Sequence, residues 1–300
     1  MINKNIAVVF SITKNLLFAV ANVIHGIEKH SPNFVDQYII FLDSFESKND
    51  MDILRGIGHG KVAFELFDTK QYKQNANINQ NLPKYSIMCF GLFECIRYLE
   101  KYRFVIFLDP DLLVQKDISG IISKSYVKMA SGRLTIEEAL GRKISNEQLK
   151  NKKACNSGVV VFNSKISELI ELKTLYSDCV SFANSYLNTL VFPDQAVINL
   201  VLGIHQIPID KLDWKYNSMI QSKGLFYASA IVHSVGGKSK FWNNGVTNLM
   251  FPEWNANHQK WLNLGGSDYA GPRFFWKVRE YSKKELFEVF KFAINHGFKI

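Results

Sequence analysis

The sequence predicts an α/β fold built on a mostly parallel central sheet. Three observations support this: short apolar runs rich in β-branched residues recur along the chain, segments with helical spacing of apolar residues separate them, and several runs end in an aspartate. Strands that are apolar throughout are typical of parallel sheets covered by helices on both faces. Ligands bind beyond the carboxyl ends of such strands, so the terminal aspartates are expected near the functional site.

The elements alternate over the first hundred residues. Four apolar runs predict strands, at Ile6–Phe10, Gln37–Asp43, Lys61–Asp68 and Arg103–Asp109. Apolar residues at helical spacing predict helices over residues 16–30 and 87–100. This alternation of strand and helix is the pattern expected of a Rossmann-like domain.

The second half of the chain is less regular. Residues 131–153 are polar and end in a basic run, which predicts an insertion with some helix. A strand is expected at Gly158–Ser164 and another at Ile231–His233, with helices over 165–187 and 193–203. Pro193 and Asp194 suit the first turn of the second helix. We expect one catalytic domain over residues 1–250 and a helical appendage over residues 251–300.

The bulk composition limits the classes of function. The 300 residues are 47% hydrophobic and 21% charged, as in ordinary globular proteins, and the net charge of +9 suggests acidic partners such as phosphorylated substrates, anionic lipids or nucleic acid. We expect no nucleic-acid partner, because the basic residues are scattered and no zinc-finger or RNP-like motif occurs.

The location predicted from the sequence is cytoplasmic. The four cysteines form no CxxC pair and are expected to be free thiols in a reducing compartment. No segment reaches 18 uncharged apolar residues, and polar residues at 13–15 interrupt the apolar N-terminal segment. A membrane-spanning helix and a signal peptide are therefore not expected.

A pair of carboxylates follows the strand that ends at residue 109. Asp109 and Asp111 point the same way, because successive side chains of an extended chain alternate sides. Pro110 removes one backbone donor, which suits a strand that is ending. Two converging carboxylates repel unless a cation lies between them, and hard divalent ions prefer such oxygens. The pair therefore indicates a metal site.

The carboxylate pair is also compatible with an ordinary turn or with a phosphatase site. Asp-Pro is common in turns, so a turn accounts for these residues without any metal. Aspartate-based phosphatases place two acids after an apolar strand as well. In those enzymes a hydroxyl residue usually stands two places after the second acid, and the pair lies on the first strand. Here Leu112, Leu113 and Val114 follow the second acid, and several strands precede the pair.

A second cluster of polar residues follows the predicted strand at Ile231–His233. The passage HSVGGKSKFW begins at His233 and contains Gly236, Lys240 and Trp242. Histidine binds manganese, iron or zinc, while glycines allow close backbone approach to a phosphate and lysine supplies a point charge. A lone histidine on a strand is more often a packed core residue, but the glycines and lysines that follow favour a phosphate site.

The ordered motifs resemble those of glycosyltransferase family 8, the retaining sugar-nucleotide-dependent transferases that include bacterial lipopolysaccharide galactosyl- and glucosyltransferases and glycogenin. The family pattern is Asp-x-Asp, Asn-x-Gly, Asp-Gln and His-x-x-Gly-x-x-x-Lys-x-Trp. The matching residues are Asp109 and Asp111, Asn156 and Gly158, Asp194 and Gln195, and His233, Gly236, Lys240 and Trp242. The resemblance covers the chain from about Ile6 to Trp242.

The resemblance implies a GT-A fold and transfer of a hexose from a UDP-sugar to a saccharide acceptor, in lipopolysaccharide, lipooligosaccharide or another surface glycan. It implies these roles: Asp109, Asp111 and His233 as ligands of Mn²⁺ or Mg²⁺; Asp109, Gly236 and Lys240 at the diphosphate; Asn156 and Asp194 at the donor sugar; Gln195 beside the anomeric carbon; and Ser11, Thr13 and Asn15 at the base and ribose. Gln195 and Asp194 are thus the implied catalytic residues. Because an amide is a poor nucleophile, we expect same-face displacement rather than a covalent intermediate.

The chain departs from the family pattern at two places. Thr13 stands where the family usually has an acid that grips the uracil and ribose. Phe90-Gly91-Leu92 stands where it usually has Tyr-x-Arg, with the arginine near the donor. UDP remains the predicted nucleotide, and a catalytically silent nucleotide-sugar or glycan-binding protein is the alternative.

The last residues form a basic, aromatic segment. Residues 273–300 contain seven Lys or Arg against three Glu, a net charge of +4, with interleaved aromatic residues. Such a segment can lie on an anionic membrane surface, which suits a lipid-linked acceptor and peripheral contact with the inner face of the cytoplasmic membrane. A helix packed on the domain with a solvated lysine face would give the same pattern.

Overall fold

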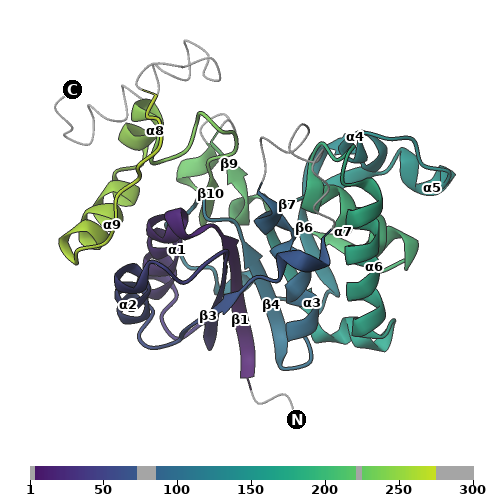
Figure 1. The fold of residues 1–300 in the computed structure, drawn as a ribbon, viewed down its shortest axis with the longest axis horizontal. Coiled ribbons are helices and arrows are strands. Elements are labelled where there is room, and N and C mark those ends of the chain that lie inside the picture. The colour runs from purple at the N-terminus through teal and green to yellow at the C-terminus, as the bar shows by residue number, and fades with distance from the viewer. Residues whose placement is uncertain (1–3, 73–85, 221–224, 275–300) are drawn as a thin grey trace.

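The computed structural model describes residues 4–72, 86–220 and 225–274. Within that part, seven strands form one sheet in the order β3-β2-β1-β4-β7-β6-β8, with helices on both faces (Figure 1). The strands of this sheet are β1 (Lys4–Ile12), β2 (Gln37–Leu42), β3 (Val62–Leu66), β4 (Tyr102–Leu108), β6 (Val127–Thr135), β7 (Lys153–Asn163) and β8 (Ile209–Lys211).

The predicted mostly parallel sheet is confirmed. Strand β7 pairs antiparallel with β4 and β6, and each of the other neighbouring pairs is parallel. A second, three-stranded sheet has the order β5-β10-β9, with β5 at Leu112–Val114, β9 at Ser218–Met219 and β10 at Ile231–His233. Figure 1 shows β9 and β10 beyond the carboxyl ends of the central strands, where the sequence places the functional site.

The helices differ in how far they are buried, and α1 and α7 are buried over most of their length. Their bounds are α1 (Leu17–His30), α2 (Lys48–Ile57), α3 (Glu94–Tyr98), α4 (Ile136–Leu140), α5 (Glu147–Lys150), α6 (Leu172–Tyr186), α7 (Pro193–Ile204), α8 (Gly245–Met250) and α9 (Pro252–Asn263). The start of α7 agrees with the prediction from Pro193 and Asp194, since proline's fixed φ suits the first helical turn.

Side-chain alternation along the strands produces two apolar layers. Val8 and Phe10 of β1 face α1 and α9, whereas Ala7 and Val9 face the layer that contains α6 and α7. All four side chains have no exposed surface. Because both faces of β1 are covered, the strand reads as a continuous apolar run in the sequence.

Two predicted segments differ in detail. Residues 87–100 begin as a 3-10 helix, η4 (Ile87–Phe93), and become α-helical only at α3. Gly91 lies so close to Ser11 that a Cβ there would approach its Oγ to 2.1 Å, so the tight turn fits against β1. The expected insertion at 131–153 is largely ordered: β6 continues to Thr135, and β7 begins at Lys153 because the two strands pair.

The described part of the predicted appendage packs on the main layers. Helix α9 lies against α1, and Trp254 and Trp261 are each 1% exposed within the same apolar cluster as β1. Asn22 donates a hydrogen bond to the Trp254 carbonyl at 2.7 Å. The division of the chain at residue 250 stays a prediction, and residues 275–300 lie outside the described residues.

An ion-pair cluster also joins α9 to α1. Glu253 accepts hydrogen bonds from Lys29 at 2.5 Å and from His30 at 2.8 Å. Burial acts to raise the pKa of Glu253, but these two partners outweigh it and hold the pKa below its ordinary value. The carboxylate is therefore a stabilising partner of α1 when it is ionised.

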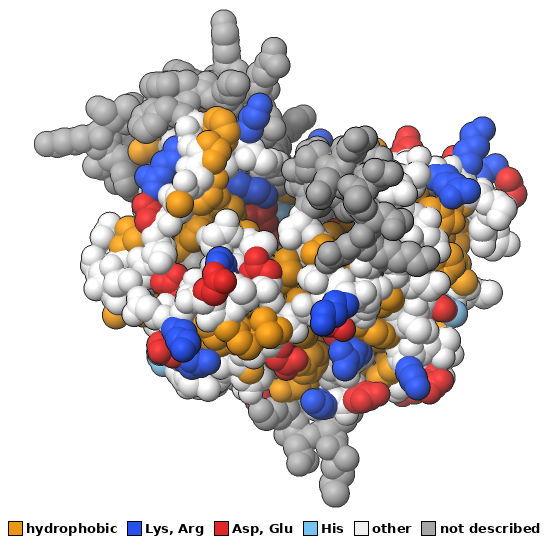
Figure 2. Space-filling view, in the orientation of Figure 1, with side chains coloured by type: hydrophobic (Ala, Val, Ile, Leu, Met, Phe, Trp, Pro, Cys, Tyr) orange, Lys and Arg blue, Asp and Glu red, His pale blue; other side chains and the backbone are white. Residues whose placement is uncertain are grey.

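The surface carries charges of both signs. Figure 2 shows lysine and arginine side chains interspersed with acidic ones over the described part of the face that is drawn. Among the described residues, no helix has both the length and the hydropathy needed to span a membrane.

Candidate metal and donor-binding site

Three side chains from separate elements converge beyond the end of β4. Asp109 and Asp111 flank the turn between β4 and β5, and His233 ends β10. The His233 Nε2 atom lies 3.6 Å from Asp109 Oδ2 and 3.3 Å from Asp111 Oδ1. One ligand atom from each residue lies within 4.8 Å of the others. The structure thus brings together the three residues predicted to bind a metal.

The small sheet explains how this convergence arises. In β5 and β10, His233 pairs with Leu112, directly after Asp111, and Ser234 donates from its backbone nitrogen to the Asp111 carbonyl at 3.0 Å. The pairing fixes the histidine beside the second aspartate although more than a hundred residues separate them. The turn itself is held by the Asp109 backbone nitrogen, which donates to the Gly158 carbonyl at 2.9 Å.

Gly158 leaves the space that these ligands occupy. A Cβ at this position would lie 2.2 Å from His233 Cε1 and 2.8 Å from Asp109 Oδ2, both closer than real Cβ contacts. The glycine of the Asn-x-Gly motif is therefore required by close packing against two candidate ligands.

A chain of amide hydrogen bonds fixes the ring orientation of His233. The Gly158 backbone nitrogen can only donate, and it donates to Asn156 Oδ1 at 3.1 Å. Asn217 donates to that same oxygen at 2.7 Å through Nδ2, so its Oδ1 faces His233 Nδ1 at 2.9 Å. Since Oδ1 can only accept, Nδ1 carries a hydrogen, which leaves Nε2, the atom that faces the two carboxylates, as the ring nitrogen that can bind a metal.

The same chain continues to Gln195 on α7. Asn156 donates through Nδ2 to Gln195 Oε1 at 3.4 Å. One turn further along the helix, Asn199 accepts from the Cys155 backbone nitrogen at 2.8 Å and donates to the Cys155 carbonyl at 2.9 Å. Helix α7 is thereby fixed to β7, and Gln195, which is 7% exposed, faces the Asn156 side chain.

Lys240 lies within contact of Asp111, so one carboxylate faces both a lysine and a histidine. Burial acts to raise the pKa of Asp111, but Lys240 and His233 outweigh it and lower the pKa well below its ordinary value. At Asp109, burial and then repulsion by Asp111 raise the pKa to about 7. A cation bound between Asp109 and Asp111 would add to the charge of Lys240 and favour ionisation of both carboxyl groups.

The remaining residues of the donor motifs lie around this centre. Burial raises the pKa of Asp194, which also accepts a hydrogen bond from Ser157. Gly236 adopts a φ of 101°, a conformation that residues with a Cβ rarely take, so the glycine is required by the turn after β10. The charge of Asp194 acts on Asp109, which places the start of α7 close to the metal ligands.

The three residues predicted at the base and ribose lie at the same edge of the sheet. Val9 pairs with Phe107, so Ser11, near the end of β1, lies level with Asp109, which follows β4. The Ser11 hydroxyl donates to the Met88 carbonyl at 2.6 Å and is 9% exposed. Thr13 donates to the Asn15 side chain. The structure thus shows these side chains in local contacts, and their role in nucleotide binding stays a prediction.

The three ligand residues fit a divalent ion. An octahedral ion at about 2.1 Å from its ligands places adjacent ligand atoms about 3 Å apart, close to the separations found here. The two carboxylates suit manganese or magnesium, and the imidazole favours a transition metal such as manganese over magnesium. His233 would bind through Nε2, and each aspartate through an oxygen that faces this nitrogen.

Comparison with known families decides the class of protein. The sequence model of glycosyl transferase family 8 matches residues 7–245. The chain belongs to glycosyltransferase family 8. The resemblance found in the ordered motifs is therefore confirmed, and the protein is a glycosyltransferase. A comparison with curated proteins gave no match.

Solved structures confirm the GT-A fold expected of a family 8 glycosyltransferase. The galactosyltransferase LgtC, solved with donor and acceptor sugar analogues, is 15% identical, with a TM-score of 0.64 over 86% of this chain and 99% of that chain. The bifunctional glycosyltransferase WbbM is 14% identical, with a TM-score of 0.60 over 88% of this chain and 51% of that chain. GlyE of Streptococcus pneumoniae is 14% identical, with a TM-score of 0.56 over 91% and 67%.

Two residues of this family 8 site were not identified from the sequence. Asn217 fixes the tautomer of His233, and Asn199 fixes α7 against β7. Neither follows a strand in a recognisable motif, and an isolated asparagine is common in loops and helices. The signal that finds them is the three-dimensional hydrogen-bond chain itself.

Proposed function

We propose that this family 8 enzyme is a retaining, Mn²⁺-dependent hexosyltransferase that moves a sugar from UDP to a saccharide acceptor. The observation that carries the proposal is the convergence of Asp109, Asp111 and the Nε2 atom of His233 at the edge of the sheet where nucleotides bind. The proposal includes lipopolysaccharide or another surface glycan as the product class, in line with the structural similarity to the galactosyltransferase LgtC.

The metal ligands and Lys240 act on the leaving group. Breaking the bond between sugar and diphosphate leaves negative charge on the departing phosphate, and a bound divalent ion supplies a Lewis acid that opposes this charge. Lys240 places a second positive charge beside Asp111, and the turn at Gly236 allows close approach of the backbone. We assign the diphosphate to this side of the site.

Gln195 supports displacement on the face of the leaving group. Retention requires either a covalent intermediate or attack on the leaving group's own face. The Oε1 atom of Gln195 accepts a hydrogen bond from Asn156, and an amide is a weak nucleophile in any case. We assign Gln195 to positioning at the anomeric carbon and Asp194 to the donor sugar. The leaving phosphate oxygen then takes the proton of the acceptor hydroxyl.

A mutation of Gln195 tests this mechanism. Gln195→Ala should reduce turnover without abolishing it, and a sugar-loaded enzyme should not accumulate when the donor is given alone. Intact-protein mass spectrometry after incubation with the donor measures this directly. A hexose adduct on any side chain of the wild-type or variant enzyme would contradict same-face displacement.

The donor is tested by a panel of nucleotide sugars. Binding raises the apparent melting temperature by mass action, so a thermal-shift screen with Mn²⁺ should identify a UDP-sugar above GDP- and CMP-sugars. The best donor should then be hydrolysed slowly in the absence of acceptor. If UDP binds but no UDP-sugar is hydrolysed or transferred, the result would favour a catalytically silent nucleotide-sugar-binding protein.

The proposal also covers the acceptor and the place of action. A lipid-linked acceptor fits peripheral contact with the cytoplasmic membrane through residues 273–300, whose net charge is +4. The full chain should co-sediment with vesicles that contain phosphatidylglycerol, and a chain shortened after Phe274 should remain in the supernatant. Equal sedimentation of both chains would remove the membrane contact from the proposal.

A further inference from the structure

The chain returns to the donor site after α9. Residues 264–274, here called the strap, lead back to residues 234–244, here called the glycine–lysine loop. Phe274 of the strap forms a parallel bridge with Asn244 of the loop. Its backbone nitrogen donates to the Asn243 carbonyl at 2.5 Å, and its carbonyl accepts from the Gly245 nitrogen at 3.2 Å. The strap therefore adds backbone hydrogen bonds directly to the end of the loop.

The loop needs such support because its backbone can adopt many conformations on its own. The loop contains two adjacent glycines and no helix or strand between β10 and the bridge at Asn244. Ordering a glycine costs more entropy than ordering other residues. Asn243 donates to the Gly237 carbonyl at 2.9 Å and accepts from the Lys240 nitrogen at 3.1 Å. Asn244 donates to the Lys238 carbonyl at 2.8 Å. The two asparagines thus close the loop on itself at the position that the strap holds.

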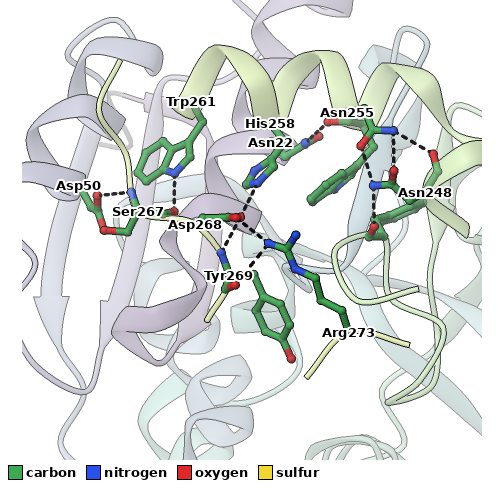
Figure 3. Close-up of polar contacts among 12 residues, drawn as sticks. Asn22, Asp50, Asn248, Asn255, His258, Trp261, Ser267, Asp268, Tyr269 and Arg273 are labelled. Carbon is green, nitrogen blue, oxygen red and sulfur yellow. Dashed lines mark hydrogen bonds and ion pairs between the residues drawn. The ribbon is translucent and has the colours of Figure 1, made fainter. Parts of the chain in front are cut away.

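The strap is itself held at two further points. Its Ser267 donates to Asp50 at 3.0 Å and accepts from the Trp261 indole at 2.8 Å, which ties its start to α2 and α9. Its Asp268 lies 2.9 Å from His258 and 2.5 Å from Arg273. Figure 3 shows the Asp268 carboxylate between these two side chains, with Tyr269 beside Arg273.

Aromatic packing makes a second connection between strap and loop. The ring centroids of Tyr269 and Trp242 lie 6.3 Å apart, and both rings contact Phe18 at the start of α1, at 5.9 and 5.5 Å. Trp242 lies two residues after Lys240. The Tyr269 side chain and the Phe274 backbone, both of the strap, therefore contact the same short part of the loop, residues 242–244.

We infer that the strap is part of the donor site: it presets the glycine–lysine loop for the diphosphate, with Asn243 and Asp268 as positioning residues. This inference rests on the proposed function, since it assigns the diphosphate to Gly236 and Lys240. A preset loop reduces the ordering cost of binding, so loosening it weakens donor affinity more than it changes turnover of bound donor.

The central test uses Asp268→Asn in the full-length chain. The amide keeps the acceptor for the Tyr269 nitrogen, which donates at 2.7 Å, and removes the charge that pairs with His258 and Arg273. The dissociation constant of UDP in Mn²⁺ and the donor KM should each rise by about twofold to fivefold, the range of a partly exposed ion pair, while kcat stays near that of wild type. Asp268→Glu, which retains the charge, should recover part of the affinity.

A matched control is available on the other layer of the molecule. Asp178 on α6 lies 2.7 Å from His205 at the end of α7, in a partly exposed pair of the same type. Asp178→Asn should leave UDP affinity and donor KM unchanged, even where it lowers the melting temperature as much as Asp268→Asn does. Asn243→Ala, which deletes both hydrogen bonds inside the loop, should weaken UDP by about tenfold.

The outcomes separate the inference from the proposed function. Wild-type UDP affinity in Asp268→Asn, or an equal loss in Asp178→Asn, would overturn the role of the strap while the transferase proposal stands. A wild-type chain that neither binds UDP with Mn²⁺ nor hydrolyses any UDP-sugar would overturn the proposed function and the strap's role with it.

Discussion

Replacing Asn217 tests whether an amide that is not itself a ligand controls the metal site. Asn217→Leu keeps the approximate volume of a side chain that is 6% exposed, but removes its bonds to His233 Nδ1 at 2.9 Å and to Asn156 Oδ1 at 2.7 Å. The His233 ring then loses the acceptor that fixes its tautomer. The bond to His233 is buried and the bond to Asn156 is partly buried, so water replaces the first of them poorly.

The expected loss follows from the position of Asn217 behind His233, a proposed metal ligand. Removing the group that hydrogen-bonds the other ring nitrogen of a metal-binding histidine typically lowers metal affinity by about 10–100-fold, or roughly 1.4–2.7 kcal/mol. Stability should fall by about 1–3 kcal/mol as well, because buried donors and acceptors lose their partners. Asn217→Asp keeps an acceptor that faces Nδ1, so metal affinity should fall much less than in Asn217→Leu.

Calorimetric titration with Mn²⁺ at saturating UDP measures the metal affinity of each variant. Asn163→Leu is the matched control, because Asn163 is 2% exposed and ends β7, five residues beyond Gly158 of the proposed site. It should lose stability without losing metal affinity. Wild-type Mn²⁺ affinity in Asn217→Leu, or an equal loss in Asn163→Leu, would refute the proposed orientation of His233.

Three further predictions address the site and the fold. Asp111→Asn should abolish Mn²⁺-dependent turnover with an unchanged circular dichroism spectrum, and full activity in a chelator-treated assay would contradict the metal assignment. Gly158→Ala should weaken Mn²⁺ binding at least tenfold and destabilise by about 1–3 kcal/mol, whereas Gly56→Ala, where a Cβ meets nothing within 4 Å, should stabilise α2 by about 0.5–1 kcal/mol in urea unfolding. Because the pKa of Glu253 is lowered in the folded protein, its charge stabilises the fold at pH values above its unfolded pKa, and this contribution disappears as the pH falls through the folded pKa. Glu253→Gln should therefore lower the unfolding free energy at pH 7 and leave it nearly unchanged at pH 3. Equal losses at both pH values would show that the charge is irrelevant.

The sequence predicted the centre of the site because the topology leaves little choice. Apolar runs mark parallel strands, and their carboxyl ends meet at one edge, so the aspartates that end these runs were expected near the functional site. The apolar pattern of such strands has a short period, which one sequence displays directly. The antiparallel pairing of β5 with β10 that brings His233 beside Asp111 has no such signal, and the grouping of His233 with the two aspartates was expected from the family resemblance.

The parts that were not predicted depend on tertiary contacts. Asn217 and Asn199 look like any other asparagine in the sequence, and only the fold shows that one meets a histidine and the other a strand. Helix α2 buries just three side chains, Asp50, Met51 and Leu54, and no helix was predicted at residues 48–57. The start of β7 at Lys153 is polar and is set by pairing with β6 rather than by its own residues.

The most direct test of the account is to locate the metal. A crystal grown with UDP and Mn²⁺ and measured at the manganese absorption edge should show one strong anomalous peak bonded to Asp109, Asp111 and the Nε2 atom of His233, in contact with the diphosphate. A nucleotide bound with no anomalous peak at these three side chains, or a peak bonded to other residues, would contradict it.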